Sequence, residues 1–299
     1  MGGDIGDIEE TYEVLGRLSE DGGNGDLYVG RDRATGEKVA VKTQMPWRID
    51  TWAEHEEYGE KLIEEGRLML SLSGFGGIPE LIATGTYQED ACLVMELIEG
   101  RQLRDVLTER RPVKDPGTIA SIIGQLCETL QEVHRAKLVH CDLKPENVLV
   151  QPDGRLRLID VGLAARIGNA TPEGIGTTGY ASPEQLEMNS QGLDGRSDIY
   201  GLGCMLLEMT VLRLPYGGLE RRVRRGYPVL PPAHLDSIPP EFRDLALRMV
   251  QWEPEDRPAD VREVFEQIRA YLPGPNSERP RKPLRPDPTE YYRTRAPRL

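Results

Sequence analysis

Hydrophobic positions divide the chain into a first third of strand-like runs and a longer remainder with helical spacing. In the first third, short apolar runs are separated by turns that contain Gly and Asp. Between about 53 and 72 the spacing becomes helical. We therefore expect one helix among several strands, and the strands are expected over 14–18, 27–31, 39–43, 81–87 and 92–97.

After Gly100 the pattern is mainly helical. Apolar residues recur at three-and-four spacing from Ile119 to Val133, which predicts a helix with one long face for a core. A hairpin is expected where 148–150 and 156–159 flank the turn at 152–154. Helical spacing returns near 261–268.

The composition changes at Pro273. The last 27 residues hold seven prolines and seven Lys or Arg against three acids, with few aliphatic side chains. Such a segment lacks the apolar surface to fold alone, so 273–299 is expected to be extended or disordered. Its Pro-x-x-Pro spacing leaves three roles open: docking on a partner, binding an acidic surface of its own domain, or acting as a tether.

Overall composition and charge are those of a soluble cytoplasmic protein. The 299 residues, 38% hydrophobic and 29% charged, suffice for one large domain or two lobes. No run approaches the ~20 apolar residues of a transmembrane segment, and the first residues are not a secretory signal. The net charge of −13 argues against nucleic acid as a partner. Four scattered cysteines indicate free thiols.

Candidate chemistry is concentrated in the run H-C-D-L-K-P-E-N at 140–147. It places a base, a cation and a metal-binding amide within one loop, which suits phosphoryl transfer to a hydroxyl. The run resembles the catalytic loop of eukaryotic-type protein kinases, in its serine/threonine form. The resemblance implies Asp142 as base, Lys144 as the neutralising cation and Asn147 as a Mg²⁺ ligand. Cys141 stands where the family usually has Arg.

A second motif, V-A-V-K at 39–42, resembles the family's V-A-I-K. The resemblance implies that Lys42 binds the α- and β-phosphates of ATP and pairs with a Glu on the following helix. Glu65 is the best candidate, because Met69 and Leu72 follow it on the same helical face. The rival candidates are Glu57, Glu60 and Glu64.

Further motifs follow in the family's order. Asp160, in D-V-G at 160–162, is implied to be the principal Mg²⁺ ligand. Gly22 and Gly25 match a phosphate-covering glycine loop, although Glu20 replaces its first Gly. Thr177, in a segment that ends in S-P-E, is expected near the catalytic loop.

Other implied roles rest on family order alone. Asp198 would brace the catalytic loop, and Arg257 would pair with Glu184. Met95 would guard the rear of an adenine pocket, and Glu96 and Ile98 would offer backbone groups to the adenine edge. The adenine faces would be enclosed by Leu27, Ala40 and Leu149.

The resemblance runs from about 12 to 272 and implies an α+β, bilobal protein-kinase fold. Its β-rich N-lobe would span about 12–97 and its helical C-lobe about 98–272, with ATP and Mg²⁺, or Mn²⁺, between them. The expected activity is that of a serine/threonine protein kinase, most similar to the bacterial members, with protein Ser/Thr hydroxyls as acceptors. The alternatives are a pseudokinase or nucleotide-binding scaffold and a small-molecule kinase. Because Cys141 replaces Arg, we also hypothesise that activity needs no activation-loop phosphorylation.

Overall fold

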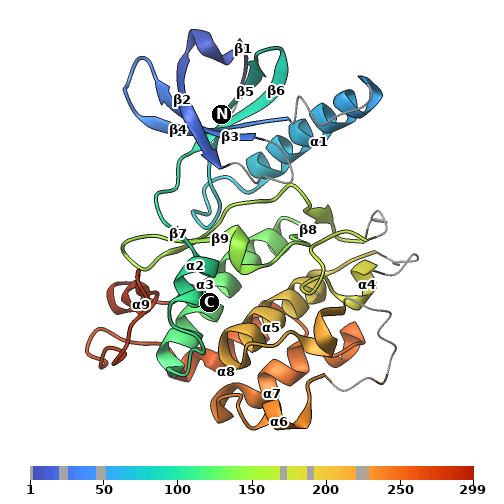
Figure 1. Cartoon of the computed structure of the whole chain (residues 1–299), viewed down its shortest axis with the longest axis vertical. Helices are drawn as coiled ribbons and strands as arrows, with labels where there is room; N and C mark the ends of the chain where they lie inside the picture. The colour runs from blue at the N-terminus through green and yellow to red at the C-terminus, as the bar shows by residue number, and fades with distance from the viewer. Residues whose placement is uncertain are drawn as a thin grey trace. The chain divides into compact units, whose positions relative to one another are not determined.

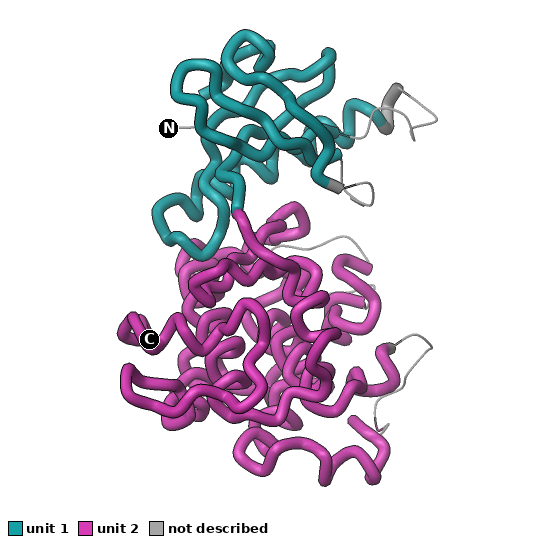
Figure 2. The backbone as a smooth tube through the Cα atoms, turned by 60° about the vertical axis from the view of Figure 1, so that its left-hand side comes forward, with its two compact units in different colours: residues 1–98 teal, residues 99–299 magenta. Residues whose placement is uncertain are grey.

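A computed structural model describes residues 3–19, 26–44, 52–168, 174–186, 192–219, 226 and 229–299. The chain forms two compact units, Met1–Ile98 and Glu99–Leu299 (Figure 2). Each unit has its own sheet or sheets and its own buried core, so they are described separately.

The first unit is built on a six-stranded sheet with the order β1-β5-β6-β4-β3-β2 (Figure 1). Helix α1 packs against β5 and β6. A close approach is possible because Gly66 faces Leu93: a Cβ at Gly66 would lie 2.9 Å from a Leu93 methyl group. The elements are β1 (Gly3–Asp7), η1 (Ile8–Glu10), β2 (Tyr12–Ser19), β3 (Asp26–Asp32), β4 (Lys38–Thr43), α1 (Trp52–Ser71), β5 (Leu81–Tyr87) and β6 (Asp90–Glu96).

Strand β1 was not expected from the sequence. It pairs in parallel with β5, whereas the other strand pairs of this sheet are antiparallel. All its residues are exposed, so it carries no hydrophobic alternation by which a strand is normally predicted. Ile8, directly after β1, is fully buried in the core and anchors the strand to it.

The second unit is mainly helical. Helix α3 begins behind Asp115, whose carboxylate accepts a hydrogen bond from the Thr118 amide, with Pro116 in the first turn. The predicted apolar face from Ile119 to Val133 is buried, and α3 packs against α5 and α8. Among the described residues, none of the helices is both long and apolar enough to cross a bilayer.

Small sheets lie among these helices, in the strand orders β10-β9-β7 and β11-β8. The predicted hairpin is confirmed as β9 and β10, with Gly154 at a φ of 80° in its turn. The elements are β7 (Arg101–Gln102), α2 (Leu103–Thr108), α3 (Pro116–Arg135), β8 (Leu138–Val139), η2 (Pro145–Asn147), β9 (Val148–Val150), β10 (Leu156–Leu158), β11 (Ala165–Arg166), α4 (Pro183–Leu186), α5 (Gly195–Val211), η3 (Pro215–Leu219), α6 (Pro232–Leu235), α7 (Pro240–Met249), η4 (Pro254–Asp256), α8 (Val261–Ile268), η5 (Arg269–Tyr271) and α9 (Thr289–Thr294).

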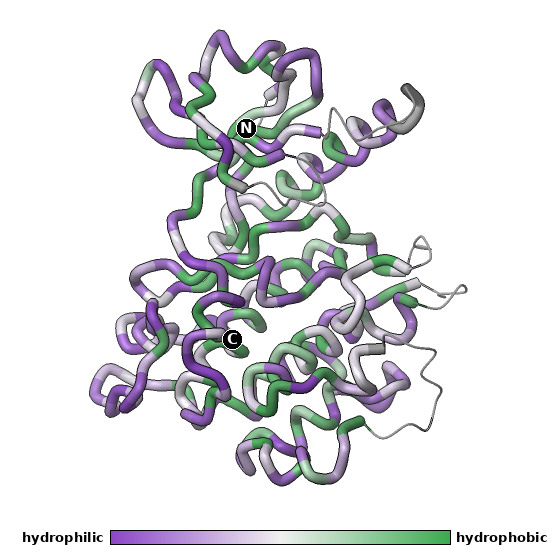
Figure 3. The backbone as a smooth tube through the Cα atoms, in the orientation of Figure 1, coloured by the Kyte–Doolittle hydropathy of each residue, from purple (hydrophilic) through white to green (hydrophobic). Residues whose placement is uncertain are grey.

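The segment 273–299 differs from the expectation of an extended or disordered tail. It contains helix α9 and buries Leu284, Thr289, Tyr291 and Tyr292. Figure 3 shows that the segment is mostly hydrophilic, and this composition is the reason that disorder was predicted. Its burial depends on tyrosines and polar anchors rather than on aliphatic residues, so a count of aliphatic side chains misses it.

Candidate active site

In the first unit, β4 and α1 bring Lys42 and Glu65 together. The Lys42 ammonium lies 2.7 and 2.8 Å from the two carboxylate oxygens of Glu65. Both side chains are largely buried, with 12% and 6% of their surfaces exposed. A buried charge is costly unless it is paired, so the contact with Glu65 fixes the position of the lysine side chain.

The rival glutamates face solvent. Glu57 pairs with Lys61 and Glu64 pairs with Arg67, both on exposed parts of α1, and Glu60 is exposed. The burial pattern follows the helical stripe from which Glu65 was predicted.

In the second unit, the loop between β8 and η2 holds Asp142 as the centre of a polar cluster. Asp142 is buried, and its Oδ1 accepts a hydrogen bond of 2.6 Å from the Thr177 hydroxyl. Its Oδ2 lies 2.9 Å from the Lys144 ammonium, which also donates to the Thr177 hydroxyl at 2.7 Å. The structure therefore brings together the expected base, the expected cation and the activation-segment threonine.

Asn147, also buried, completes the cluster. Its amide nitrogen donates to the backbone oxygen and to Oδ2 of Asp142, at 2.9 and 2.8 Å. Both partners are acceptors, so they fix the orientation of the amide. Within the part of the chain that the structure describes, the amide oxygen of Asn147 accepts no hydrogen bond, so it is the atom that can contact a cation.

Asp160 follows the hairpin formed by β9 and β10. The amide of Ile159 donates to the backbone oxygen of Asn147 at 2.9 Å, which ties the two ends of the hairpin together. The Asp160 Oδ1 accepts a hydrogen bond from the Gly162 amide at 2.9 Å. A carboxylate and an amide oxygen are the donors that hard divalent cations prefer, so the residues fit such a group.

The buried carboxylate of Asp198 anchors the backbone of the catalytic loop. Asp198, in the first turn of α5, accepts hydrogen bonds from the amides of His140 and Cys141, at 2.9 and 3.0 Å. His134 lies 2.8 Å from it. Burial alone raises the pKa of Asp198, but the contacts with His134 and His140 outweigh burial and hold the pKa below its usual range.

Cys141 places an apolar side chain in this loop, at the position where the family usually has the cationic side chain of Arg. Its φ is 67°, in the left-handed region that non-Gly residues seldom occupy. Burial raises the pKa of its thiol, which therefore stays neutral. The side chain packs in a cluster with Val139, Leu163, Ala165, Ile175 and Leu193.

Gln185 links the activation segment to the same loop and was missed in the sequence. Its amide nitrogen donates to the backbone oxygens of Cys141 and Ile175, at 2.7 and 3.2 Å. Its amide oxygen accepts from the amide and the hydroxyl of Ser182, both at 3.0 Å. Its position directly after S-P-E is the only signal in the sequence.

Arg257, which is buried, and Glu184, which is half-buried, form an ion pair with two contacts, at 2.6 and 2.8 Å. The Ser197 hydroxyl donates to the same carboxylate at 2.8 Å. Burial raises the pKa of Glu184, but the guanidinium of Arg257 outweighs burial and lowers the pKa below its usual range.

A second arginine cluster was also missed. Arg104 of α2 donates to Glu146 of the catalytic loop at 2.6 Å and to Glu208 of α5. It also donates to the Tyr180 hydroxyl, which in turn donates to Glu208. The residues are separated by up to 104 positions, so no local pattern predicts their convergence.

The residues expected around adenine are only partly placed. Gly22, Gly25 and Glu20 lie outside the described residues. Within the first unit, Ala40 of β4 pairs with Met95 of β6, Val39 pairs with Glu96, and Leu27 pairs with Lys42. Ala40 and Met95 are buried. Ile98 ends this unit, whereas Leu149 is a half-buried residue of β9 in the second unit.

Comparison with known proteins assigns the family. Residues 11–269 match the protein kinase domain. The chain is 31% identical over 268 residues to serine/threonine-protein kinase PknL of Mycobacterium tuberculosis, which covers 85% of this chain and 64% of PknL. It is 32% identical to serine/threonine-protein kinase pkn2 of Myxococcus xanthus, covering 88% of this chain and 32% of that protein. It is 33% identical to the probable serine/threonine-protein kinase PknB of Corynebacterium glutamicum, covering 71% of this chain and 33% of that protein.

The chain thus spans less than two thirds of the length of these relatives. The α+β kinase fold expected from the sequence is confirmed by the family match and by the β-rich and helical units. With a match over most of its length and all these motifs in order, this chain belongs to the protein kinase family.

Proposed function

We propose that this protein is a serine/threonine protein kinase, which transfers the γ-phosphoryl group of ATP to a Ser or Thr hydroxyl of a protein. Family membership implies ATP as the donor and a divalent cation. The observation that carries the proposal is the position of Asp142, a buried carboxylate held by Asn147, Lys144 and Thr177. The names of the relatives support protein Ser/Thr as the acceptor.

In the proposed reaction, the acceptor hydroxyl forms a bond to the γ-phosphorus while the bond from that phosphorus to the oxygen bridging to the β-phosphate breaks. Asp142 orients the hydroxyl and takes up its proton. Lys144, already directed at Asp142 and Thr177, offsets negative charge on the transferred group. ADP leaves with the electron pair of the broken bond.

Two further parts bind the donor. Lys42, held by Glu65, contacts the α- and β-phosphates in this proposal. Asn147 and Asp160 hold a divalent cation, for which we propose Mg²⁺, with Mn²⁺ as a substitute. When bound, the cation supplies charge neutralisation on the phosphates.

A reducing, cytoplasmic environment for this domain belongs to the proposal. The four cysteines are free and buried. Burial raises the pKa of Cys92 to about 12, so its thiol is protonated and inert.

Phosphate transfer from labelled ATP to a generic protein substrate tests the proposal. Asp142→Asn retains the size of the side chain but loses the base, so we expect a rate loss of roughly 10²–10⁴-fold. Asp244→Asn, on the exposed face of α7, is the matched control and should transfer phosphate like the unaltered protein. Label should appear on Ser or Thr.

Two outcomes would overturn the proposal. An unaltered protein that binds Mg-ATP without transferring phosphate would be a pseudokinase or scaffold. Transfer to a small molecule but to no protein would indicate a small-molecule kinase.

A further inference from the structure

Residues 273–299, here named the C-terminal strap, lie beyond the part of the chain that matches the family domain. They nevertheless pack against the second unit, through helix α9 and α3. Of this strap, Tyr291 and Tyr292 each leave only 2% of their surface exposed. These two side chains therefore have a defined binding surface on the domain.

The first attachment of the strap is the carboxylate of Glu128, a buried residue of α3. The hydroxyls of Tyr291 and Tyr292 donate to it at 3.3 and 3.1 Å. The backbone amide of Arg298 donates at 2.9 Å, and the guanidinium lies 3.3 Å away. A buried carboxylate requires such donors, and in the described structure it obtains them from the strap.

The second attachment is the turn of the hairpin between β9 and β10. Gln125 of α3 donates to the backbone oxygens of Gly154 and Pro288, at 3.1 and 3.3 Å, and accepts from the Leu156 amide at 2.8 Å. A Cβ at Gly154 would lie 2.3 Å from the backbone oxygen of Asp287. Only glycine fits between the hairpin and the strap.

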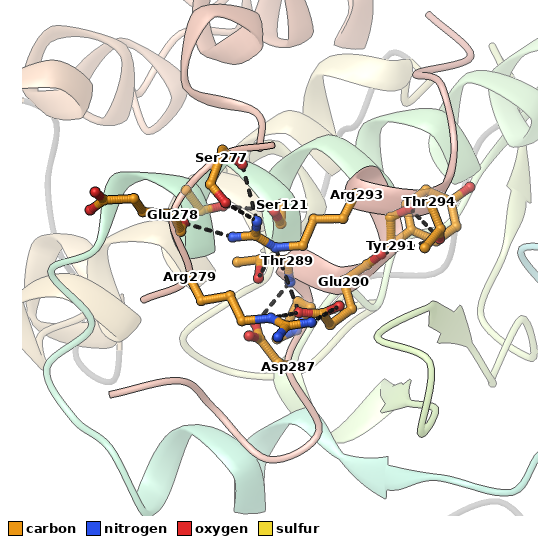
Figure 4. A network of polar contacts seen from close by, with 12 residues as sticks. Ser121, Ser277, Glu278, Arg279, Asp287, Thr289, Glu290, Tyr291, Arg293 and Thr294 are labelled. Carbon is orange, nitrogen blue, oxygen red and sulfur yellow. Dashed lines mark hydrogen bonds and ion pairs between the residues drawn. The ribbon is translucent and has the colours of Figure 1, made fainter. Parts of the chain in front are cut away.

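Hydrogen bonds within the strap hold it in shape (Figure 4). Arg293 donates to the backbone oxygens of Ser277 and Glu278, which joins α9 to the beginning of the strap. The Thr289 amide donates to Asp287 at 3.0 Å at the start of the helix. Arg279 forms an exposed ion pair with Glu290 at 2.8 Å.

The two candidate cation ligands lie at the end of the hairpin whose turn contacts the strap. Asn147 directly precedes β9, and Asp160 is the second residue after the end of β10. The backbone bond between Ile159 and Asn147 connects the two strands at that end. The turn and both ligands therefore belong to one short hydrogen-bonded hairpin.

We propose that the C-terminal strap is a positioning element for the cation site, and that it holds the hairpin against α3 so that Asn147 and Asp160 keep their geometry. The proposal rests on the proposed kinase function only for the identity of the bound cation. Neither the strap nor its contacts belong to the reacting groups. They act through the hairpin.

The double variant Tyr291→Phe/Tyr292→Phe, in the full chain, tests this. It removes both hydroxyl donors to Glu128 but keeps the two rings, whose centres are 5.0 Å apart, so the protein should remain folded. Arg279→Ala is the control, because it removes an ion pair on the outer side of the same strap. A second variant, Gly154→Ala, forces the turn away from Asp287.

Two measurements are made on each protein. Hydrogen exchange of the peptide spanning 148–160 should speed up in the double variant and in Gly154→Ala, but not in Arg279→Ala. The Mg²⁺ concentration for half-maximal activity should rise, by about three- to ten-fold, which is smaller than the ~10–100-fold typical of groups that touch a metal ligand directly. The KM for the protein substrate should stay unchanged.

Unchanged exchange of 148–160 in both the double tyrosine variant and Gly154→Ala would overturn the proposal, and so would equal losses in kcat at saturating Mg²⁺ without a shift in Mg²⁺ dependence. If the unaltered protein transfers no phosphate, the proposed function fails. The exchange measurement then still decides whether the strap holds the hairpin.

Discussion

At the scale of single residues, four buried or half-buried charges near the candidate site have a specific partner. Lys42 has Glu65, Asp142 has Lys144, Asp198 has His134, and Glu184 has Arg257. Taking a charge out of water costs several kcal/mol unless a partner compensates. The pairs therefore fix side-chain positions more than they raise stability.

The Lys42–Glu65 pair gives a prediction at this scale. Glu65→Gln leaves Lys42 in place but removes the charge that orients it, so we expect kcat/KM for ATP to fall about ten-fold, or ~1.4 kcal/mol of transition-state stabilisation. Lys42→Met removes the cation itself and should cost roughly 10²–10³-fold. Steady-state kinetics at varied ATP measures both.

Glu64→Gln is the matched control for that experiment. Its carboxylate pairs with Arg67 at the surface of α1, and exposed pairs contribute about 0–1 kcal/mol. Equal losses in the Glu64 and Glu65 variants would show that α1, and not the ion pair, is responsible.

Sequence motifs predicted some of these contacts because each motif lies within one element. The helical stripe of α1 selected Glu65, and the loop at 140–147 gave Asp142, Lys144 and Asn147. The cluster around Arg104 was not predictable in this way, because α2, the catalytic loop, the activation segment and α5 supply one residue each. The left-handed φ of Cys141 likewise follows from the tertiary bonds of its amide and carbonyl, to Asp198 and Gln185.

At the scale of elements, the activation segment is attached to the backbone and side chain of Cys141 in the catalytic loop by neutral contacts. Ile175 packs in the apolar cluster with Cys141, and the Gln185 side chain bonds both partners. A phosphorylated residue would have no cation at position 141 to bind. At Cys141, the described part of the segment, 174–186, is therefore held by packing and by amide hydrogen bonds.

This leads to the second prediction. After phosphatase treatment, the unaltered protein and Thr171→Ala should transfer phosphate at rates that agree within about two-fold, since the neutral contacts persist without a phosphate. Thr171 itself lies outside the described residues. Initial rates before and after treatment provide the measurement, with Gln185→Ala as the variant that should lose activity. A collapse of the treated protein to background would refute the prediction.

Elements were predictable where the hydrophobic period is strong. The buried face of α3 and the hairpin at β9 and β10 appear where they were expected. Strand β1 has no apolar period, and α9 is surrounded by prolines and arginines. Both elements are held by tertiary contacts of particular residues, Ile8 and Glu128, which no local propensity encodes.

At the scale of the whole molecule, buried ionised carboxylates link stability to pH. The folded-state pKa values of Glu184 and Asp198 are lowered, whereas in the unfolded chain they are about 4.3 and 3.9. Their contribution is therefore complete above pH ~5 and is lost as the pH falls through the unfolded values toward the lower folded ones. The unfolded state binds protons first, which favours unfolding.

The third prediction follows from that sign. The thermal unfolding midpoint should be nearly constant from pH 7 to 5.5 and fall from about pH 5 downward. Glu184→Gln should unfold at a lower temperature at pH 7, because Arg257 is left buried without its charge partner, but its midpoint should change less steeply below pH 5. Parallel curves for the two proteins would contradict the assigned role of Glu184.

The packing of β1 against β5 bears on how the protein is handled. A recombinant fragment trimmed to the family limits, 11–269, would lose β1 and Ile8 at one end and all of 273–299 at the other. The N-terminal truncation would expose the edge of β5, and an exposed sheet edge promotes association between molecules. The C-terminal truncation would remove the hydrogen-bond donors of the Glu128 carboxylate. Poor yield or aggregation of such a fragment would then result from the positions at which it was truncated, and not from an intrinsically unstable catalytic domain.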